Sequence, residues 1–198
     1  HAEPMNYPKC YSLLLILLFP ILSGCVPFVV AGVGVGAGTG ALISEDRRSS
    51  GIFIEDQAIE LKASRRINEQ LGRDARINVT SFNRNVLLTG EAPNESMKNE
   101  AEKLAMSVEN VRNVFNEIAI SEKSALSVRT NDSLITSKVK GRFLSERKFQ
   151  INYVKVITEN SIVYLLGLVT REEGESAAQI ASTTAGARKV VKVFEYLN

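Results

Sequence analysis

The sequence predicts an α+β fold built from two tandem modules, each with the element order αββαβ. Two observations lead to this prediction. First, a pattern of helical and alternating apolar spacing occurs twice, and the residues that head the two copies, Ile59 and Ile135, lie 76 residues apart. Second, the stretches VRNVFNEI from Val111 and ARKVVKVF from Ala187 align at the same offset. Each module should form a small three-stranded mixed sheet covered on one face by two helices.

The first module is predicted to span residues 56–120. Its first helix should begin at an N-cap, Asp56, and carries apolar residues at helical spacing: Ile59, Ala63, Ile67 and Leu71. Two alternating strands follow, joined by a turn at 83–85, and the second should end at Gly90. A second helix after Pro93 has one apolar face, made of Met97, Ala101, Leu104, Ala105 and Val108. The last strand should contain Val111, Val114 and Ile118.

The second module, predicted at residues 132–198, repeats this order after a linker at 121–131. Asp132 should cap a helix whose core positions are Ile135, Val139 and Phe143. A hairpin follows, with its turn at 159–160 and its second strand ending at Gly167. The second helix and the last strand carry the remaining apolar positions: Ala177, Ile180, Ala181, Thr184, Val190 and Val193.

The N-terminal part of the chain carries the apolar run LLLILLFPILSGCVPF, from Leu13 to Phe28. Its apolar core is too short for a membrane-spanning helix, which needs roughly 20 residues, but it fits the roughly 7–15 of a signal peptide. Lys9 supplies the preceding positive charge. A buried core helix is the alternative, but Pro20 and the missing polar face argue against it. We therefore expect a signal peptide at 1–24, with Met5 as the natural start and residues 1–4 as a remnant.

The run ends in Leu22-Ser23-Gly24-Cys25, which resembles the bacterial lipobox. The resemblance implies that a diacylglyceryl group is attached to the Cys25 sulfur, that the chain is cut before Cys25, and that the new amine is acylated. A thiolate is the strong nucleophile that such chemistry needs, and several acyl chains give stable anchoring. In lipoproteins of this kind an Asp after the cysteine favours the inner membrane. Val26 occupies that position here, so we expect anchoring at the periplasmic face of the outer membrane.

The segment 25–55 should be the acylated cysteine and a flexible tether. Its stretch AGVGVGAGTGALIS, from Ala31 to Ser44, is rich in glycine and small residues, and the polar residues 46–50 continue it. One register of the stretch fits Gly-x-Gly-x-x-Ala, but a dinucleotide site requires a strand before this motif and a helix after it. A tether near the membrane is therefore the favoured interpretation.

The composition excludes several classes of function. The chain has 198 residues and a net charge of +2, which is too balanced to indicate nucleic acid as a partner. Cys10 and the only histidine, His1, would leave with the signal peptide, and Cys25 would be acylated. A mature chain without histidine or free thiol loses most metal sites, cysteine nucleophiles and Ser-His-Asp triads. We expect no cofactor besides the covalent lipid, and no metal.

The repeated pattern resembles the BON family (bacterial OsmY and nodulation domain) over roughly 56–198. The matching features are the early aspartates, the glycines near the strand ends, and the Val-x-x-Val stretch before each last strand. The family has Gly-Val before that stretch, whereas this chain has Asn110-Val111 and Gly186-Ala187. With the lipobox, the chain resembles the dual BON-domain outer-membrane lipoproteins associated with division and envelope stress. That resemblance implies a non-enzymatic periplasmic protein that binds anionic phospholipid through its second module and supports outer-membrane integrity. It also implies proximity to the β-barrel assembly machinery or to the division site.

Charge and helix phase identify a candidate lipid-binding face in the second module. Residues 56–120 hold 9 Lys/Arg and 10 Asp/Glu, whereas residues 132–198 hold 10 and 7, and basic residues favour an anionic surface. At 100° per residue, Leu134 lies off the core stripe of the first helix. The predicted phospholipid-binding residues are Leu134, Ser137, Lys138, Gly141, Arg142 and Ser145. The alternatives are an ordinary solvated surface, or packing of Leu134 against the first module.

Two other functions compete with lipid binding. One is a scaffold that binds other envelope proteins and touches the membrane only through Cys25. The other is an enzyme that uses the glutamates clustered near two helix starts, Glu95, Glu100 and Glu102, and Glu172, Glu173 and Glu175. Carboxylates at such positions usually complement the helix N-terminus, so we expect no catalysis.

Overall fold

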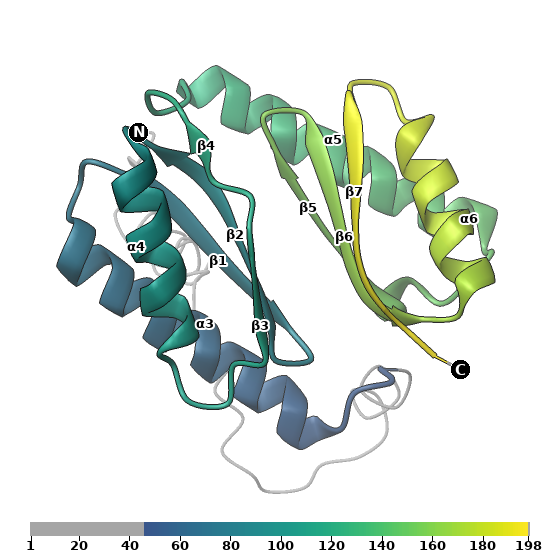
Figure 1. Ribbon diagram of the computed structural model, residues 1–198. Coiled ribbons are helices and arrows are strands. Elements are labelled where there is room, and N and C mark those ends of the chain that lie inside the picture. The colour runs from purple at the N-terminus through teal and green to yellow at the C-terminus, as the bar shows by residue number, and fades with distance from the viewer. Residues whose placement is uncertain (1–45, 198) are drawn as a thin grey trace, which may run out of the picture. The chain divides into compact units, whose positions relative to one another are not determined.

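The computed structural model describes residues 46–197 and consists of two αββαβ modules (Figure 1). The first module contains α3 (Ser50–Leu71), β1 (Arg76–Phe82), β2 (Asn85–Ala92), α4 (Glu95–Met106), β3 (Asn113–Asn116) and β4 (Ala119–Ile120). The second contains α5 (Leu126–Glu146), a 3₁₀ turn (Ile151–Tyr153), β5 (Val154–Glu159), β6 (Ile162–Val169), α6 (Arg171–Ser182) and β7 (Lys189–Tyr196). The predicted α+β class with two helix-covered modules is therefore confirmed. The predicted signal peptide, Cys25 and the tether up to residue 45 lie outside the described residues.

Both sheets are mixed and have the same strand order. In each module the first two strands form an antiparallel hairpin, and the strand after the second helix pairs in parallel with the hairpin's second strand, giving the orders β1-β2-β3 and β5-β6-β7. Gly90 pairs with Ile77 and Gly167 pairs with Val154. The central strands continue for two residues beyond these glycines, which therefore do not end the strands as predicted.

The last strand of the first module is split, where the sequence predicted one continuous strand. Asn116 lies at the split, and its side chain bonds one backbone group in the same segment and one in helix α4 instead of a group in the sheet. Its Oδ1 accepts the Ile118 N–H at 3.4 Å, and its Nδ2 donates to the Lys98 carbonyl at 3.0 Å. Ile118 lies between β3 and β4 and is buried in the core, while β4 continues the parallel pairing with β2.

The N-cap of the first helix of each module lies seven residues before the predicted one. In α3, Ser49 is the N-cap, and its Oγ accepts the Ile52 N–H at 3.3 Å. Asp56 and Asp132 therefore lie inside helices α3 and α5, and their prediction as N-caps was wrong. Helix α3 already runs from Ser50, so its first six residues lie within the segment 25–55 that was predicted as the tether.

The two aspartates instead hold the turn of the neighbouring hairpin. The buried Asp56 carboxylate accepts the N–H groups of Asn83 and Arg84 at 2.8 and 2.7 Å. The Asp132 carboxylate accepts those of Asn160 and Ser161 at 2.9 and 2.8 Å. All four turn residues have positive φ, between 51° and 64°, which is the geometry of a tight hairpin turn. Each module thus fastens its first helix to its hairpin by the same bond pair.

Three apolar clusters make up the core. Each module has one cluster between its helices and the facing side of its sheet, and the predicted core residues of α3 and α5 belong to these two clusters. The third cluster joins the helix-free faces of the two sheets and consists of Phe82, Leu87, Tyr164, Leu166 and Val193. This follows from strand alternation, since Leu87 points opposite to its neighbours in the strand, which face the helices. The modules therefore bury their second sheet faces against each other.

Candidate functional site

The candidate site is the outward face of helix α5, which lies opposite the core. Ile135, Val139 and Phe143 are buried between this helix and its sheet, as the sequence predicted. Leu134 is 55% exposed and therefore does not pack against the first module. Of the other predicted lipid-binding residues, Ser137, Lys138, Gly141 and Ser145 are exposed and Arg142 is half-buried. The structure thus places the predicted set along one helix, with Leu134 free of the core.

Two further leucines extend this face over the length of the helix. Leu126 and Leu144 are 70% and 59% exposed. They are 18 residues apart, which is five helical turns, so they share one angular position about 27 Å apart along the axis. Leu134 lies about 80° from them around the helix. Together these three leucines, which we call the leucine face, form an apolar strip on the side away from the sheet.

Basic side chains border the leucine face on both sides. At 100° per residue Lys138 falls on one border and Lys140 and Arg129 fall on the other, and all three are exposed. The two acidic residues of α5 do not oppose this charge, because Asp132 is buried and Glu146 pairs with Arg142 at 2.7 Å. An apolar strip flanked by cations on a helix suits the boundary between headgroups and acyl chains of an anionic bilayer.

The hydroxyl groups on this face are satisfied within the helix. Thr130, Ser133 and Ser137 donate to the carbonyls of Leu126, Arg129 and Ser133 at 3.0, 3.1 and 2.9 Å. Such bonds to the preceding turn remove the need for water as a partner. The small residues can therefore enter an interface of lower polarity at little cost in lost hydrogen bonds.

Arg142 has a structural task that the sequence did not reveal. Its guanidinium donates to the Ile180 carbonyl at 2.7 Å and to Thr183 Oγ1 at 2.8 Å, at the end of α6. The first module has the same arrangement, since Arg66 donates to the carbonyl and Oγ of Ser107, both at 2.8 Å, at the end of α4. This bond joins the two helices of each module, and it leaves Arg142 less free than Lys138 to reach a ligand.

The first helix of the first module lacks this combination of features. Helix α3 has exposed apolar residues too, including Leu61 at 72%. However, it carries four acidic and three basic residues, whereas α5 carries two acidic and four basic ones. Ala58 occupies the place of Leu134 in the first module. Of the two helices α3 and α5, it is therefore α5 that combines exposed leucines with an excess of basic residues.

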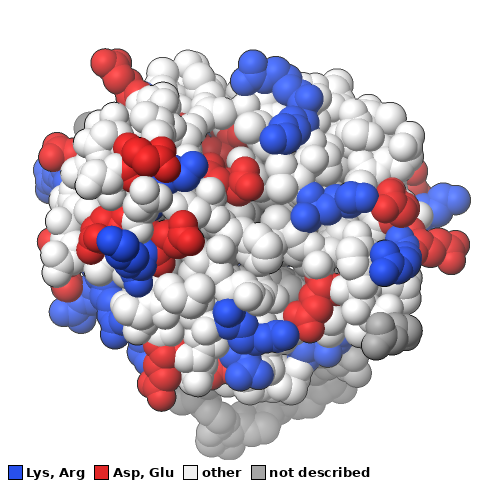
Figure 2. Space-filling view, viewed as in Figure 1, with Lys and Arg blue, Asp and Glu red and all other residues white. Residues whose placement is uncertain are grey.

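The face of the molecule seen in Figure 2 has no general excess of basic residues. In the view of Figure 2, basic and acidic residues are interspersed over the visible face. The basic character of α5 therefore comes from its own sequence rather than from a basic covering of the whole molecule.

The glutamates considered for catalysis have structural partners. Glu173 completes a capping box with Thr170 at the start of α6, and it also binds Arg47 through both oxygens at 2.6 and 2.7 Å. The hydrogen bonds from Arg47 hold the pKa of the Glu173 carboxyl below its usual range. Glu95 and Glu172 lie in the first turns of their helices, as expected for carboxylates that complement a helix N-terminus.

The part of the chain that the structure describes has neither a metal-binding cluster nor a membrane-spanning helix. Between residues 46 and 197 no three histidine, cysteine or acidic side chains come together in a way that could hold a metal ion. None of the helices in this range has the length and apolar character needed to cross a membrane.

The lipid-binding face predicted from the sequence did not include Leu126, Lys140 and Leu144. Leu126 was missed because the helix was predicted to begin at Asp132, so that the residue fell in the linker. Leu144 and Lys140 lie within the predicted helix. Applying 100° per residue along the whole of this helix places both of them away from the core stripe.

Comparison with known proteins agrees with this architecture. The model of the BON domain matches residues 55–122 and 131–198. The outer membrane lipoprotein DolP of Haemophilus influenzae is 38% identical over 179 residues, which cover 89% of this chain and 91% of that protein. A 21 kDa hemolysin of Actinobacillus pleuropneumoniae is 36% identical over 154 residues, 77% of this chain and 79% of that protein.

A more distant relative shares the same extent of match. The osmotically inducible protein Y of Escherichia coli is 26% identical over 155 residues, covering 76% of this chain and 77% of that protein. The two domain matches cover more than half of the chain and coincide with the two αββαβ modules seen in the structure. The chain therefore belongs to the BON-domain family and carries two BON modules in tandem.

Proposed function

We propose that this chain is a non-enzymatic lipoprotein of the outer membrane that binds anionic phospholipid through helix α5 of its second BON module. Cys25 would carry the lipid anchor, and the two modules would face the periplasm. Binding of phospholipid there would help to maintain outer-membrane integrity. The anchoring and the location are supported by the lipobox and by the similarity to an outer membrane lipoprotein.

One observation supports the lipid-binding role above others, namely the leucine face with lysines on both borders. Burying one leucine side chain contributes about 1.5–3 kcal/mol, and each basic residue near an anionic surface adds about 1 kcal/mol before screening by salt. Three leucines and three free cations therefore suffice for reversible binding without the acyl anchor. Covalent lipid would then raise the local concentration of this face at the membrane.

The test is co-sedimentation of the chain from Asp46 onward with liposomes of phosphatidylglycerol or of phosphatidylcholine, after circular dichroism has shown that it is folded. The unacylated protein should sediment with the anionic liposomes only. Leu134→Glu should weaken binding roughly 10- to 100-fold, because it removes apolar burial and adds a like charge. Lys138→Glu should also weaken binding to anionic liposomes, and this effect should become smaller as the salt concentration rises, because it is electrostatic.

The first module supplies matched controls. Leu61→Glu places the same change on an exposed leucine of α3 (72%, against 55% for Leu134), and Lys62 stands at the position of Lys138 in the repeat. Leu61→Glu and Lys62→Glu should leave liposome binding unchanged. If all four variants bind as the parent does, the lipid face lies elsewhere.

The competing proposal is a scaffold for envelope proteins such as the β-barrel assembly machinery or proteins of the division site. It is favoured by the exposed Phe115 and Ile120 on the open edge formed by β3 and β4, where a partner strand could add to the sheet. Absence of liposome binding by the unacylated chain would favour this proposal over the first.

A further inference from the structure

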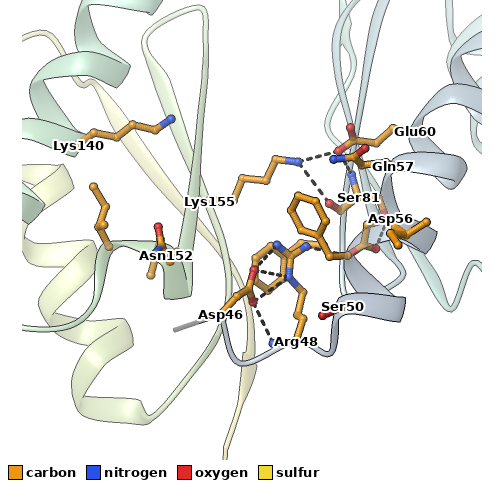
Figure 3. Close-up of a pocket in the computed structure, with 15 residues that line it drawn as sticks. Asp46, Arg48, Ser50, Asp56, Gln57, Glu60, Ser81, Lys140, Asn152 and Lys155 are labelled. Carbon is orange, nitrogen blue, oxygen red and sulfur yellow. Dashed lines mark hydrogen bonds and ion pairs between the residues drawn. The ribbon is translucent and has the colours of Figure 1, made fainter. Parts of the chain in front are cut away.

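A second feature of the structure is a groove of about 790 Å³ between the start of α3 and the residues that lead into β5 (Figure 3). This volume is in the range of small-molecule sites, which take ~300–1,000 Å³. Its walls are largely apolar and include Phe53, Ile54, Phe82, Ile151 and Val154. The groove is distinct from the leucine face, but Lys140 of α5 borders both.

The apolar residues at the mouth of this groove are not needed by the fold. Phe53 and Ile54 are 46% and 67% exposed and lie in the first turns of α3. In the repeat they correspond to Arg129 and Thr130 of α5, so the second module forms the same helix with polar residues there. Two adjacent exposed apolar side chains beside a groove indicate a surface that a ligand covers.

The charges of the groove leave one cation available. Arg48 binds both Asp46 and Asp56, at 2.7 and 2.8 Å, so one guanidinium is shared by two carboxylates and the three groups together keep one negative charge. Glu60 is held by Lys155 at 2.7 Å and by the Ser81 N–H at 2.8 Å. Lys140 makes neither an ion pair nor a hydrogen bond with any residue in 46–197, and in Figure 3 its ammonium extends toward the groove.

We infer that this groove binds the acyl chain of an anionic amphiphile, with the negative headgroup on Lys140 and the chain along Phe53, Ile54 and Ile151. The inference rests on the proposed lipid-binding function and deepens it, because it names the acyl chain as the recognised part. Lys140 shares its border of the leucine face with Arg129. A lipid attracted to this border of α5 would therefore already lie beside the groove.

The experiment is calorimetric titration of the chain from residue 25, carrying Cys25→Ser, with decyl and dodecyl phosphate below their micelle concentrations. Two added methylenes should tighten binding about tenfold if the chain is buried. Ile54→Asp should weaken binding of dodecyl phosphate by at least tenfold. Lys140→Gln should weaken dodecyl phosphate severalfold and leave the neutral dodecyl maltoside unaffected. The matched control, Leu61→Asp, changes an exposed leucine of the same helix outside the groove and should have no effect.

Several outcomes would overturn the inference. One is no binding, or equal weakening by Ile54→Asp and Leu61→Asp. Another is binding by the chain from Asp46 but not by the chain from residue 25, which would mean that the preceding residues occupy the groove. A third is dissociation of a dimer by Ile54→Asp, which would identify the groove as a contact between two copies.

The same titrations separate this inference from the proposed function. Leu134→Glu should weaken binding to liposomes roughly 10- to 100-fold while leaving the affinity for dodecyl phosphate unchanged. If liposomes bind and alkyl phosphates do not, the groove is not an acyl site although the leucine face still binds membrane. If Ile54→Asp loses alkyl phosphate and Leu134→Glu keeps liposome binding, the acyl site stands and the proposed membrane face is wrong.

Discussion

At the scale of single residues, two glycines allow the hairpins of both modules to close. A Cβ at Gly90 would lie 2.0 Å from the Arg76 carbonyl oxygen, and a Cβ at Gly167 would lie 2.5 Å from that of Tyr153. Both are backbone atoms of the neighbouring strand or of the turn leading into it, so they cannot move aside as a side chain can. Gly90 also has φ = +111°, which other residues adopt only with strain.

We therefore predict that Gly90→Ala and Gly167→Ala each lower the free energy of unfolding by about 1–3 kcal/mol. Gly141→Ala is the matched control, because nothing lies within 4 Å of its Cβ position and it is inside a helix. That change should raise stability by about 0.5–1 kcal/mol. The measurement is urea unfolding followed by circular dichroism. If all three variants unfold at the same urea concentration, the strands can move away from the added Cβ atoms without loss of stability.

At the scale of elements, the residues before α3 bind both modules. Arg47 contacts the second module, where it pairs with Glu173, donates to the Leu168 carbonyl at 3.1 Å and lies 3.8 Å from the centre of the Tyr153 ring. Arg48 contacts the first module through Asp56 and lies 4.0 Å from the Phe82 ring. The sequence placed these residues in a tether, but two consecutive arginines hold one module each.

We expect Arg47→Ala to lower the free energy of unfolding by about 1–3 kcal/mol, because it breaks a bidentate, partly buried pair and a carbonyl bond. Arg65→Ala is the control. Arg65 also pairs with a glutamate, Glu69, but both side chains are mostly exposed, so its loss should lower stability much less than the loss of Arg47. Thermal unfolding of both variants measures the difference. A melting temperature as low for Arg65→Ala as for Arg47→Ala would contradict a specific role for Arg47.

At the scale of the whole described body, a cluster of buried charges joins the modules. Glu91 of β2 is fully buried and accepts from Arg76 at 2.8 and 3.0 Å, from Asn160 at 3.0 Å, and from Ser124. Arg76 also binds Glu159 of the second module. Burial alone would raise the pKa of Glu91, but these donors outweigh it and hold that pKa below its usual value.

The sign of the pH dependence follows from this lowered pKa. A carboxyl whose folded pKa is depressed stabilises the protein fully above the unfolded value of about 4.3, and this stability is lost as pH falls through the folded pKa. We predict that acid destabilises the parent more steeply below about pH 4.3 than it does Glu91→Gln, which should already be less stable at pH 7. Urea unfolding across pH 3–7 tests this. Glu69→Gln changes an exposed glutamate and should leave the pH dependence of the free energy of unfolding as it is in the parent. If Glu91→Gln also keeps the parent's pH dependence, groups other than Glu91 cause the loss of stability in acid.

The candidate site could be predicted from the sequence in part. Helical spacing was sufficient to place Leu134 and Lys138 off the core stripe, because helix phase depends only on local geometry. It did not reveal the task of Arg142, whose partners lie 38 and 41 residues away on another helix. Nor did it reveal the groove, whose walls come from both modules.

The sequence by itself determined the two modules, their element order and their helix-facing cores. The repeat can be recognised by comparing two parts of the sequence, and apolar periodicity reflects backbone geometry within a few residues. Only the tertiary structure decided what Asp56, Asp132 and Arg47 bind. An aspartate near a predicted helix start resembles an N-cap in any sequence, but its acceptor oxygens bind whichever donors the fold brings near. For Asp132 those donors are 28 and 29 residues away, and for Arg47 the partner is 126 residues away, distances over which local pattern carries no information.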